Sequence, residues 1–176
     1  MISSRFAGFT LVELMIVIGV IGITLAFASP NISAFVQNYR MTSQTNNMLA
    51  DLQLARSNAV AQGVRVSMCA STSGTACAGT NWGAGWIVFT DANADFTVDA
   101  ATDTIVRVTE AVSSGTTIVA TNLAAAGRIQ FRPSGLASGV IGGGASFKLC
   151  DTRTGAFGRT ISISPTGRAS FAVATC

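Results

Sequence analysis

An uncharged run close to the N-terminus limits what this chain can fold into. The residues from Leu14 to Ala28 carry no charged side chain, and they directly follow Gly8-Phe9-Thr10-Leu11-Val12-Glu13. A helix that crosses a bilayer needs about 20 mostly apolar residues, so a helix over residues 9–29 is long enough to span a membrane. A carboxylate in mid-bilayer costs roughly 2.5–3.5 kcal/mol on insertion scales. Glu13 therefore needs a partner.

The N-terminal motif itself offers that partner. A cut between Gly8 and Phe9 would give Phe9 a free amine about one helical turn from Glu13, and the same amine on a staggered neighbouring copy can reach the Glu13 carboxylate. With its short leader and single basic residue, Arg5, the motif resembles the class III signal of type IV pilins and type II secretion pseudopilins. The alternative is an ordinary membrane anchor that happens to carry an acid.

This resemblance assigns roles to individual residues. It implies that a prepilin peptidase removes the leader, residues 1–8, and N-methylates Phe9. It also implies that Glu13 is required for assembly into a filament. Most members carry a proline where this chain has Pro30, and we expect Ser29-Pro30 to interrupt and bend the helix at the membrane boundary, because proline removes a helical hydrogen bond.

A second sequence motif, at the end of the predicted helix, indicates one subgroup of this family. The helix is predicted to run from Phe9 to about Gln62, with an amphipathic part over residues 30–62 whose apolar stripe should pack on the rest of the chain. That stripe comprises Ile32, Phe35, Val36, Tyr39, Leu49, Leu52, Ala55, Ala59 and Val60, while Gln44 and Asp51 are among the polar residues assigned to the other faces. The run from Leu52 to Val60 resembles a signature of the GspH/FimT pseudopilins and minor pilins.

Short strands are predicted for the head, residues 64–176, which is rich in Gly, Ala, Ser and Thr. The expected fold is α+β and pilin-like: one long N-terminal helix packed on an antiparallel, β-rich head with two sheets. The segment Trp82–Phe89 resembles a tryptophan-containing stretch of the GspH/FimT subgroup, and we interpret it as core. Strands are expected at 64–69, within 82–89, and at 104–109, 116–120, 128–132, 146–150, 159–164 and 168–174.

Four cysteines follow the anchor, and none forms a CxxC pair. A positively charged leader keeps the N-terminus in the cytoplasm, so the head should reach an oxidising space in which disulfides persist. Three connectivities are available. We favour Cys69–Cys77, which closes a short loop, and Cys150–Cys176, which ties down the C-terminus; reduced, buried thiols are the alternative.

An acidic loop is a candidate calcium site. Asp91, Asn93, Asp95 and Asp99 place oxygen ligands at alternate positions, as Ca²⁺ prefers, and Asp103 can complete the ring. The match to a calcium-binding loop is incomplete, because Phe96 stands where such loops need glycine and no glutamate closes the ring. The alternative is a solvated acidic turn between two strands.

The C-terminal half is basic and is a candidate DNA-binding surface. It carries Arg128, Arg132, Arg153, Arg159 and Arg168, and we expect Arg128 and Arg132 to share one strand face with Gln130. FimT-type members bind DNA through a C-terminal Gly-Arg-x-Arg motif. Gly167-Arg168 matches its first half, but Ser170 replaces the second arginine. The alternative is that these arginines pair with acids of neighbouring subunits or keep the head soluble.

No enzyme motif is present, and the chain has no histidine, the commonest acid–base side chain. The resemblance therefore predicts a structural minor pilin or pseudopilin of a type IV pilus or a type II secretion pseudopilus, with DNA binding during uptake as the alternative. The expected location is the inner membrane, as a single-pass protein with a cytoplasmic N-terminus and a periplasmic head. The expected partners are other pilins, prepilin peptidase, the inner-membrane assembly platform and, in the alternative, DNA.

Overall fold

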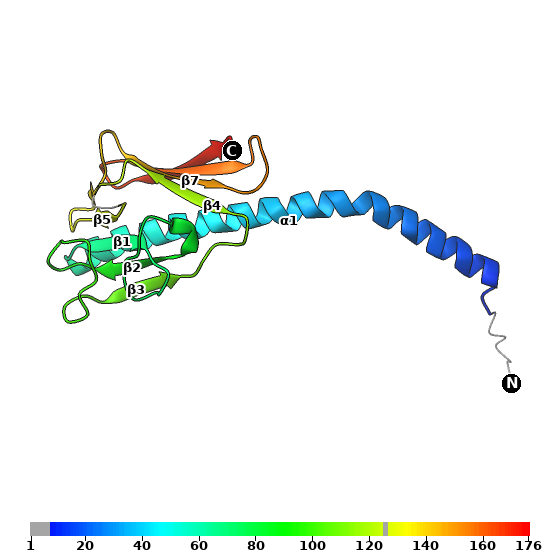
Figure 1. Cartoon of the computed structure of the whole chain (residues 1–176), viewed down its shortest axis with the longest axis horizontal. Helices are drawn as coiled ribbons and strands as arrows, with labels where there is room; N and C mark the ends of the chain where they lie inside the picture. Colours follow the sequence, from blue (N-terminus) through cyan, green and yellow to red (C-terminus); the bar gives the residue numbers. More distant parts are fainter. Residues whose placement is uncertain (1–7, 125–126) are drawn as a thin grey trace. The chain divides into compact units, whose positions relative to one another are not determined.

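The computed structural model describes residues 8–124 and 127–176, apart from the side chains of residues 27–31. The chain divides into two units, one ending at Tyr39 and one running from Arg40 to Cys176. One helix, α1 (Leu11–Gln62), contributes to both units, and Figure 1 labels it together with the strands.

Residues close to each end of α1 explain why the helix begins and stops there. The Thr10 hydroxyl accepts a hydrogen bond from the Glu13 backbone N–H at 3.2 Å, so Thr10 caps the helix and Glu13 occupies the third helical position, as in a capping box. At the other end Gly63 has a φ of +69°, which suits a helix-terminating glycine. The expected interruption at Ser29-Pro30 is wrong, since α1 stays helical across these residues; proline removes one N–H donor and leaves the flanking hydrogen bonds available. The expected bend at this point stays a prediction.

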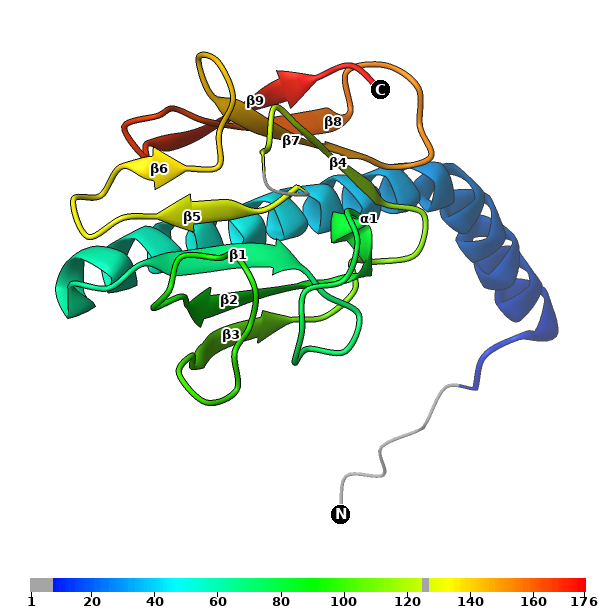
Figure 2. The same cartoon turned by 60° about the vertical axis from the view of Figure 1, so that its left-hand side comes forward.

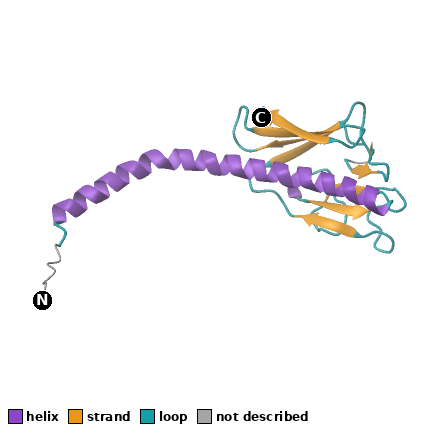
Figure 3. Cartoon of the chain, turned by 180° about the vertical axis from the view of Figure 1, so that it is seen from behind, coloured by secondary structure: helices purple, strands orange, loops and turns teal. Residues whose placement is uncertain are grey.

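Two antiparallel sheets form the rest of the second unit. The five-stranded sheet has the order β3-β2-β1-β5-β6 and the four-stranded sheet the order β4-β7-β8-β9, and both lie along the C-terminal part of α1 (Figures 2 and 3). The elements are β1 (Val66–Ala70), the 3₁₀ turn η1 (Trp82–Ala84), β2 (Trp86–Thr90), β3 (Ile105–Thr109), β4 (Thr117–Thr121), β5 (Ile129–Phe131), β6 (Ala137–Ser138), β7 (Ala145–Cys150), β8 (Gly158–Ile163) and β9 (Ala169–Ala174). The predicted α+β, pilin-like fold is confirmed; the two-residue β6 was not predicted.

One apolar core joins α1 to both sheets. Leu52, Ala55 and Ala59 of α1 are buried as predicted, because they recur at helical spacing on one face. Both tryptophans, Trp82 and Trp86, are also buried in this core, as interpreted from the sequence. The core further contains Met41, Met48, Val66, Met68, Val88, Ile129, Phe131, Phe147, Leu149, Ile161 and Ile163.

The buried face of α1 differs from the predicted one. Ile32, Phe35 and Tyr39 are exposed, whereas Gln44 and Asp51, assigned to the solvent-facing sides, are buried. Hydrophobic periodicity cannot anticipate a buried acid whose partners come from distant strands, and those partners are present for Asp51. Its carboxylate accepts hydrogen bonds from the Trp86 indole and the Thr109 hydroxyl.

Candidate assembly and binding sites

The cleavage and assembly residues are exposed, just before α1 and in its first turn. Gly8, Phe9 and Glu13 are all exposed. The apolar side chains that follow Glu13 are also exposed, namely Leu14, Met15, Ile16, Val17, Ile18, Val20, Ile21, Ile23 and Leu25. A soluble monomer rarely exposes a contiguous apolar surface of this kind without an interaction partner.

A membrane span is not established by the structure. Over residues 8–124 and 127–176, no helix is both long enough and apolar enough to cross a membrane. The transmembrane segment over residues 9–29 therefore stays a prediction. The leader residues 1–7 lie outside the described residues, as does the side chain of Pro30.

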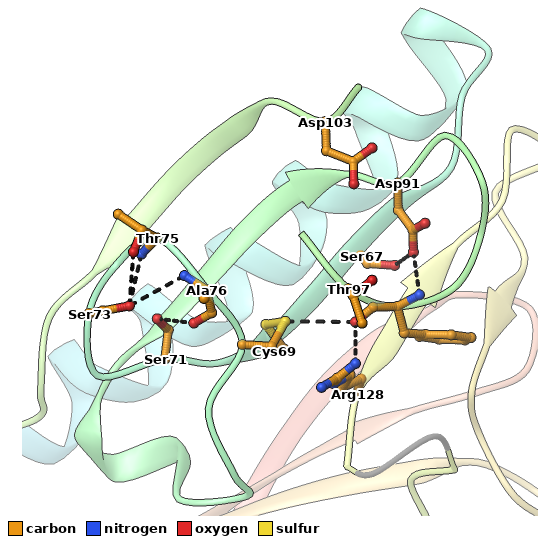
Figure 4. The surroundings of a disulfide bond; sticks show 12 residues. Ser67, Cys69, Ser71, Ser73, Thr75, Ala76, Asp91, Thr97, Asp103 and Arg128 are labelled. Carbon is orange, nitrogen blue, oxygen red and sulfur yellow. Dashed lines mark hydrogen bonds between the residues drawn. A yellow bond between two sulfur atoms is a disulfide. The ribbon is translucent and has the colours of Figure 1, made fainter. Parts of the chain in front are cut away.

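The structure contains both favoured disulfides. Cys69, on β1, is bonded to Cys77 with a Cα–Cα distance of 5.5 Å, and Figure 4 shows the surroundings of this bond. Cys150, at the end of β7, is bonded to Cys176 at 5.7 Å. The first bond closes the loop after β1, and the second fixes the C-terminal residues beside β7.

Asp91, one of the predicted calcium ligands, is held by hydrogen bonds from β1, β5 and its own loop. Its side chain is buried, and its Oδ2 accepts hydrogen bonds from the Ser67 hydroxyl at 2.6 Å, the Gln130 amide at 2.8 Å and the Phe96 backbone N–H at 3.1 Å. Figure 4 shows Asp91 turned toward Ser67. This acid therefore anchors the loop to β1 and β5 through Oδ2, while its Oδ1 is buried without a hydrogen-bond partner among the described residues.

The remaining loop acids bond within the loop. The Asn93 amide donates to Asp95 at 3.0 Å and to Asp99 at 2.8 Å, and the hydroxyl and backbone N–H of Thr97 hold the pKa of Asp95 below its ordinary value. Among the described residues no three His, Cys, Asp or Glu side chains are arranged to hold a metal. Calcium binding by Asp91, Asn93, Asp95 and Asp99 stays a prediction; a rise in melting temperature with millimolar Ca²⁺ would support it, and no shift would refute it.

Four of the five candidate arginines bond within their own neighbourhoods. Arg128 donates to the Phe96 carbonyl at 2.6 Å, Arg132 to the Ser138 hydroxyl at 2.5 Å and Arg159 to the Gly158 carbonyl at 2.9 Å. Arg153 pairs with Asp151 at 2.5 Å, and its guanidinium lies 4.2 Å from the centroid of the Phe157 ring.

The expected exposed face of Arg128, Gln130 and Arg132 is not present. Gln130 is buried and bonded to Asp91 and Ser67, because both faces of β5 are covered within the five-stranded sheet and its core contacts. Arg128 is half-buried, and only Arg132 is exposed. These side chains therefore do not form a continuous basic strip.

Arg168 lies in a different environment. It is exposed and lines a depression of about 620 Å³ on the four-stranded sheet. Ser146, Ser162 and Ser170 line the same depression and are register neighbours on β7, β8 and β9. Serine hydroxyls next to an arginine are groups that contact phosphate oxygens in nucleic-acid complexes.

Gly167, the other matched residue of the C-terminal motif, has a structural role. Its φ is +76°, and an added Cβ would collide with the Gly135 carbonyl oxygen. Both glycine-containing turns are held by Arg56, which donates to the Gly135 carbonyl at 3.0 Å and the Thr166 carbonyl at 3.2 Å. The arginine of the helical signature thus bonds to the carbonyl directly before the glycine of the C-terminal motif. Sequence analysis missed this link because neither pattern reveals the other.

The head fold and the exposed N-terminal helix together define a pilin-like protein. The family model described as type II transport protein GspH matches residues 44–167, and the prokaryotic N-terminal methylation motif matches residues 3–29. The first match covers more than half of the sequence, so the chain belongs to the GspH family.

Solved structures share this fold. The type IV minor pilin FimU of Pseudomonas aeruginosa aligns with a TM-score of 0.59 at 22% identity, over 78% of this chain and 92% of that one. The minor pseudopilin EpsH from the type 2 secretion system of Vibrio cholerae aligns with a TM-score of 0.52 at 8% identity, over 76% and 97% of the two chains. No curated protein matches the sequence. At these identities the likeness shows the fold alone.

Proposed function

We propose that this chain is a structural minor pilin or pseudopilin, not an enzyme, which is anchored in the inner membrane and assembled into a filament through its N-terminal helix. The observation that carries the proposal is the exposed apolar surface of α1 directly after Glu13, within the match to the methylation motif. Prepilin peptidase cuts between Gly8 and Phe9 and methylates Phe9. The assembly platform then transfers the subunit from the membrane to the filament.

Glu13 carries the assembly step. In the filament the amine of Phe9 from a neighbouring subunit pairs with the Glu13 carboxylate, which offsets the free-energy cost of placing the charge among apolar helices. Glu13 also lies in the first turn of α1, where a negative charge interacts favourably with the helix dipole. The test must therefore separate pairing from helix capping.

Two substitutions at Glu13 achieve that separation. Glu13→Gln removes the charge but keeps a side chain that can complete the capping box, whereas Glu13→Ala removes both. We expect both variants to keep a folded head with both disulfides and to be absent from sheared filaments. Normal incorporation of Glu13→Gln would refute the pairing. Intact mass of the mature protein is the second measurement, and retention of residues 1–8 in cells with active peptidase would refute the processing step.

DNA binding is the second candidate function, and Arg168 is the residue that favours it. Arg168 is exposed beside the serine row, and Lys148, on the same outward face of β7, is exposed as well. Arginine and lysine that neutralise phosphates release counterions, so binding must weaken as salt rises. Arg128, Arg153 and Arg159 bond to their own surroundings, whereas Arg168 and Lys148 are exposed on one face of the four-stranded sheet.

A mobility-shift titration of the soluble head at several salt concentrations tests this function. Arg168→Ala and Lys148→Ala should each weaken binding and lower the salt slope by about 1. Arg132→Ala is the matched control, because it also removes one exposed arginine but lies on the other sheet. Salt-insensitive binding, or equal losses in all three variants, would refute a site on the four-stranded sheet.

A further inference from the structure

The last strand of the four-stranded sheet has a free edge. Among the described strands β9 (Ala169–Ala174) pairs only with β8 (Figure 2). The Ser164 N–H donates to the Arg168 carbonyl at 3.0 Å, and hydrogen-bonded pairs alternate along an antiparallel ladder, so the backbone groups of Phe171 and Val173 point away from β8. β9 contains no charged residue and no proline, which are the usual devices that prevent an edge strand from pairing with another chain. This edge is therefore suited to strand addition.

The side chains of β9 on the core side of the sheet are uncovered. Phe171 is the register partner of Ile161, which is buried, and side chains directly opposite each other project to the same face. Phe171 is nevertheless 54% exposed, and Val173, on the same face, is 62% exposed. The apolar cover of this face therefore reaches Ile161 on β8 but not these two side chains of β9.

A groove of about 540 Å³ lies between the start of β9 and the C-terminal part of α1. This volume is within the roughly 300–1,000 Å³ of ordinary ligand sites. Ala169, on the same face of β9 as Phe171, lines the groove from the sheet. Leu52, Val60 and Ala61 line it from the helix, and Val60 is 54% exposed. A strand added beside β9 would place every second side chain on this apolar side.

Two arginines give the groove a positive charge. Arg56 and Arg168 line it, and its described lining residues include no acid. The Arg56 guanidinium is held in place, because Nε and Nη2 donate to the carbonyls of Gly135 and Thr166 at 3.0 and 3.2 Å. Arg168 is exposed. A carboxylate on the added strand would complement this charge at the start of β9.

We propose that the β9 edge and this groove receive an extended segment of a different pilin, which adds a strand to the four-stranded sheet. Its backbone pairs with the outward N–H and C=O groups of Phe171 and Val173, its alternate apolar side chains cover the open face of β9, and a carboxylate lies against Arg168. The inference rests on the proposed function, because a minor subunit has other pilins as its filament neighbours. Main-chain hydrogen bonds supply affinity in such pairings, and the side-chain pockets supply selectivity.

Photo-cross-linking of the full-length chain in cells tests the proposal. The photoreactive amino acid p-benzoylphenylalanine replaces Phe171, filaments are sheared from the cells, and the cross-linked partner is mapped by peptide mass spectrometry. We expect a cross-link to one segment of another pilin that has alternating apolar residues and an acid. The matched control carries the same label at Val119, which is 55% exposed on the opposite face of the sheet, and should give no cross-link to that segment.

A backbone substitution distinguishes strand addition from other ways of docking. Val173→Pro removes an N–H that points away from β8, so the β8–β9 ladder stays intact. The cross-link from position 171 should fall about three- to tenfold, as expected for the loss of one hydrogen bond. Val173→Thr is the matched control, because it keeps the N–H and the branched shape, and it should retain most of the yield. Equal yields in the two variants would contradict pairing with the β9 backbone.

Charge reversal gives the third measurement. Arg168→Glu should lower the cross-link yield and Arg168→Lys should retain most of it, whereas Arg132→Glu, next to the end of β5, should leave it unchanged. Equal losses in the two glutamate variants overturn the proposal. So does a cross-link to a second copy of this chain or to a protein that is not a pilin, or no cross-link at all, when the chain is present in filaments. Absence of the labelled and unlabelled chains from filaments would instead refute the assembly function.

Discussion

The indole Nε1 of Trp86 donates a hydrogen bond of 2.8 Å to the carboxylate of Asp51, across the boundary between β2 and α1. The Thr109 hydroxyl donates to the same Oδ2 at 2.6 Å. Asp51 is buried, and donors from two strands satisfy one oxygen of its carboxylate. This contact fixes α1 against the five-stranded sheet.

Removing the Asp51 acceptor should strongly destabilise the head. Asp51→Leu leaves the Trp86 and Thr109 donors unpaired, and each buried unsatisfied group costs about 1–3 kcal/mol, so we expect a loss of about 3 kcal/mol in urea unfolding of a fragment beginning at Arg40. Asp51→Asn keeps an oxygen acceptor and should lose less. Arg107→Ala is the control, because Arg107 lies 3.9 Å from Asp51 and is largely exposed, and such pairs contribute about 1 kcal/mol or less. Equal losses in Asp51→Asn and Asp51→Leu would contradict this explanation.

Of the two residues of the C-terminal motif, Gly167 should be required for the stability of the head, whereas Arg168 should not. Gly167→Ala should lower the melting temperature, because the Cβ collides with the Gly135 carbonyl oxygen at a backbone angle that alanine rarely adopts. Arg168→Ala should leave the melting temperature within about 2 °C, since an exposed substitution usually changes stability by less than about 0.5 kcal/mol. Calorimetry of the two variants checks both outcomes. A large loss in Arg168→Ala would assign that arginine a structural role.

Substitution of Arg56 should destabilise the head more than is usual for an exposed residue. Arg56→Lys replaces a planar group that reaches two carbonyls with a single ammonium, and we expect a loss of about 1–2 kcal/mol, one to two hydrogen bonds. Arg132→Lys is the matched control, with one hydrogen bond to a side chain instead of two to backbone turns. If both variants unfold at the same urea concentration, Arg56 does not hold the turns together.

The N-terminal signal, the helix length and most strands follow from sequence because they depend on local patterns. The Leu52–Ala59 stripe has helical spacing, and each longer strand lies between glycine-rich turns. The interior polar contacts do not follow. Asp91 was interpreted as a loop ligand and Gln130 as an exposed strand residue, yet they bond to each other. Such pairs are separated by many residues, and no periodicity identifies which polar side chain will meet a distant partner.

Low pH should reduce the contribution of the Asp151 carboxylate to the stability of the head. Its hydrogen bonds with the Arg153 side chain hold the pKa of Asp151 below its ordinary value of 3.8, so the carboxylate stabilises the head above that value and loses this effect as pH falls below it. The melting temperature of Asp151→Asn should therefore lie below that of the parent at pH 5–7, and the difference should shrink below about pH 4. A difference that stays constant down to pH 2.5 would show that packing, and not charge, is responsible.

Gln44 offers a stabilising substitution. Both polar atoms of its side chain are buried and lack a hydrogen-bond partner within the described residues, and an unsatisfied buried group costs about 1–3 kcal/mol. Gln44→Met has a similar shape without the amide, so we expect the melting temperature of the Arg40–Cys176 fragment to rise. Thr45→Val is the control, since the buried Thr45 hydroxyl is satisfied by the Met41 carbonyl at 2.7 Å and its loss should bring no gain. A fall in melting temperature for Gln44→Met would mean that the amide is satisfied in solution, as by a buried water.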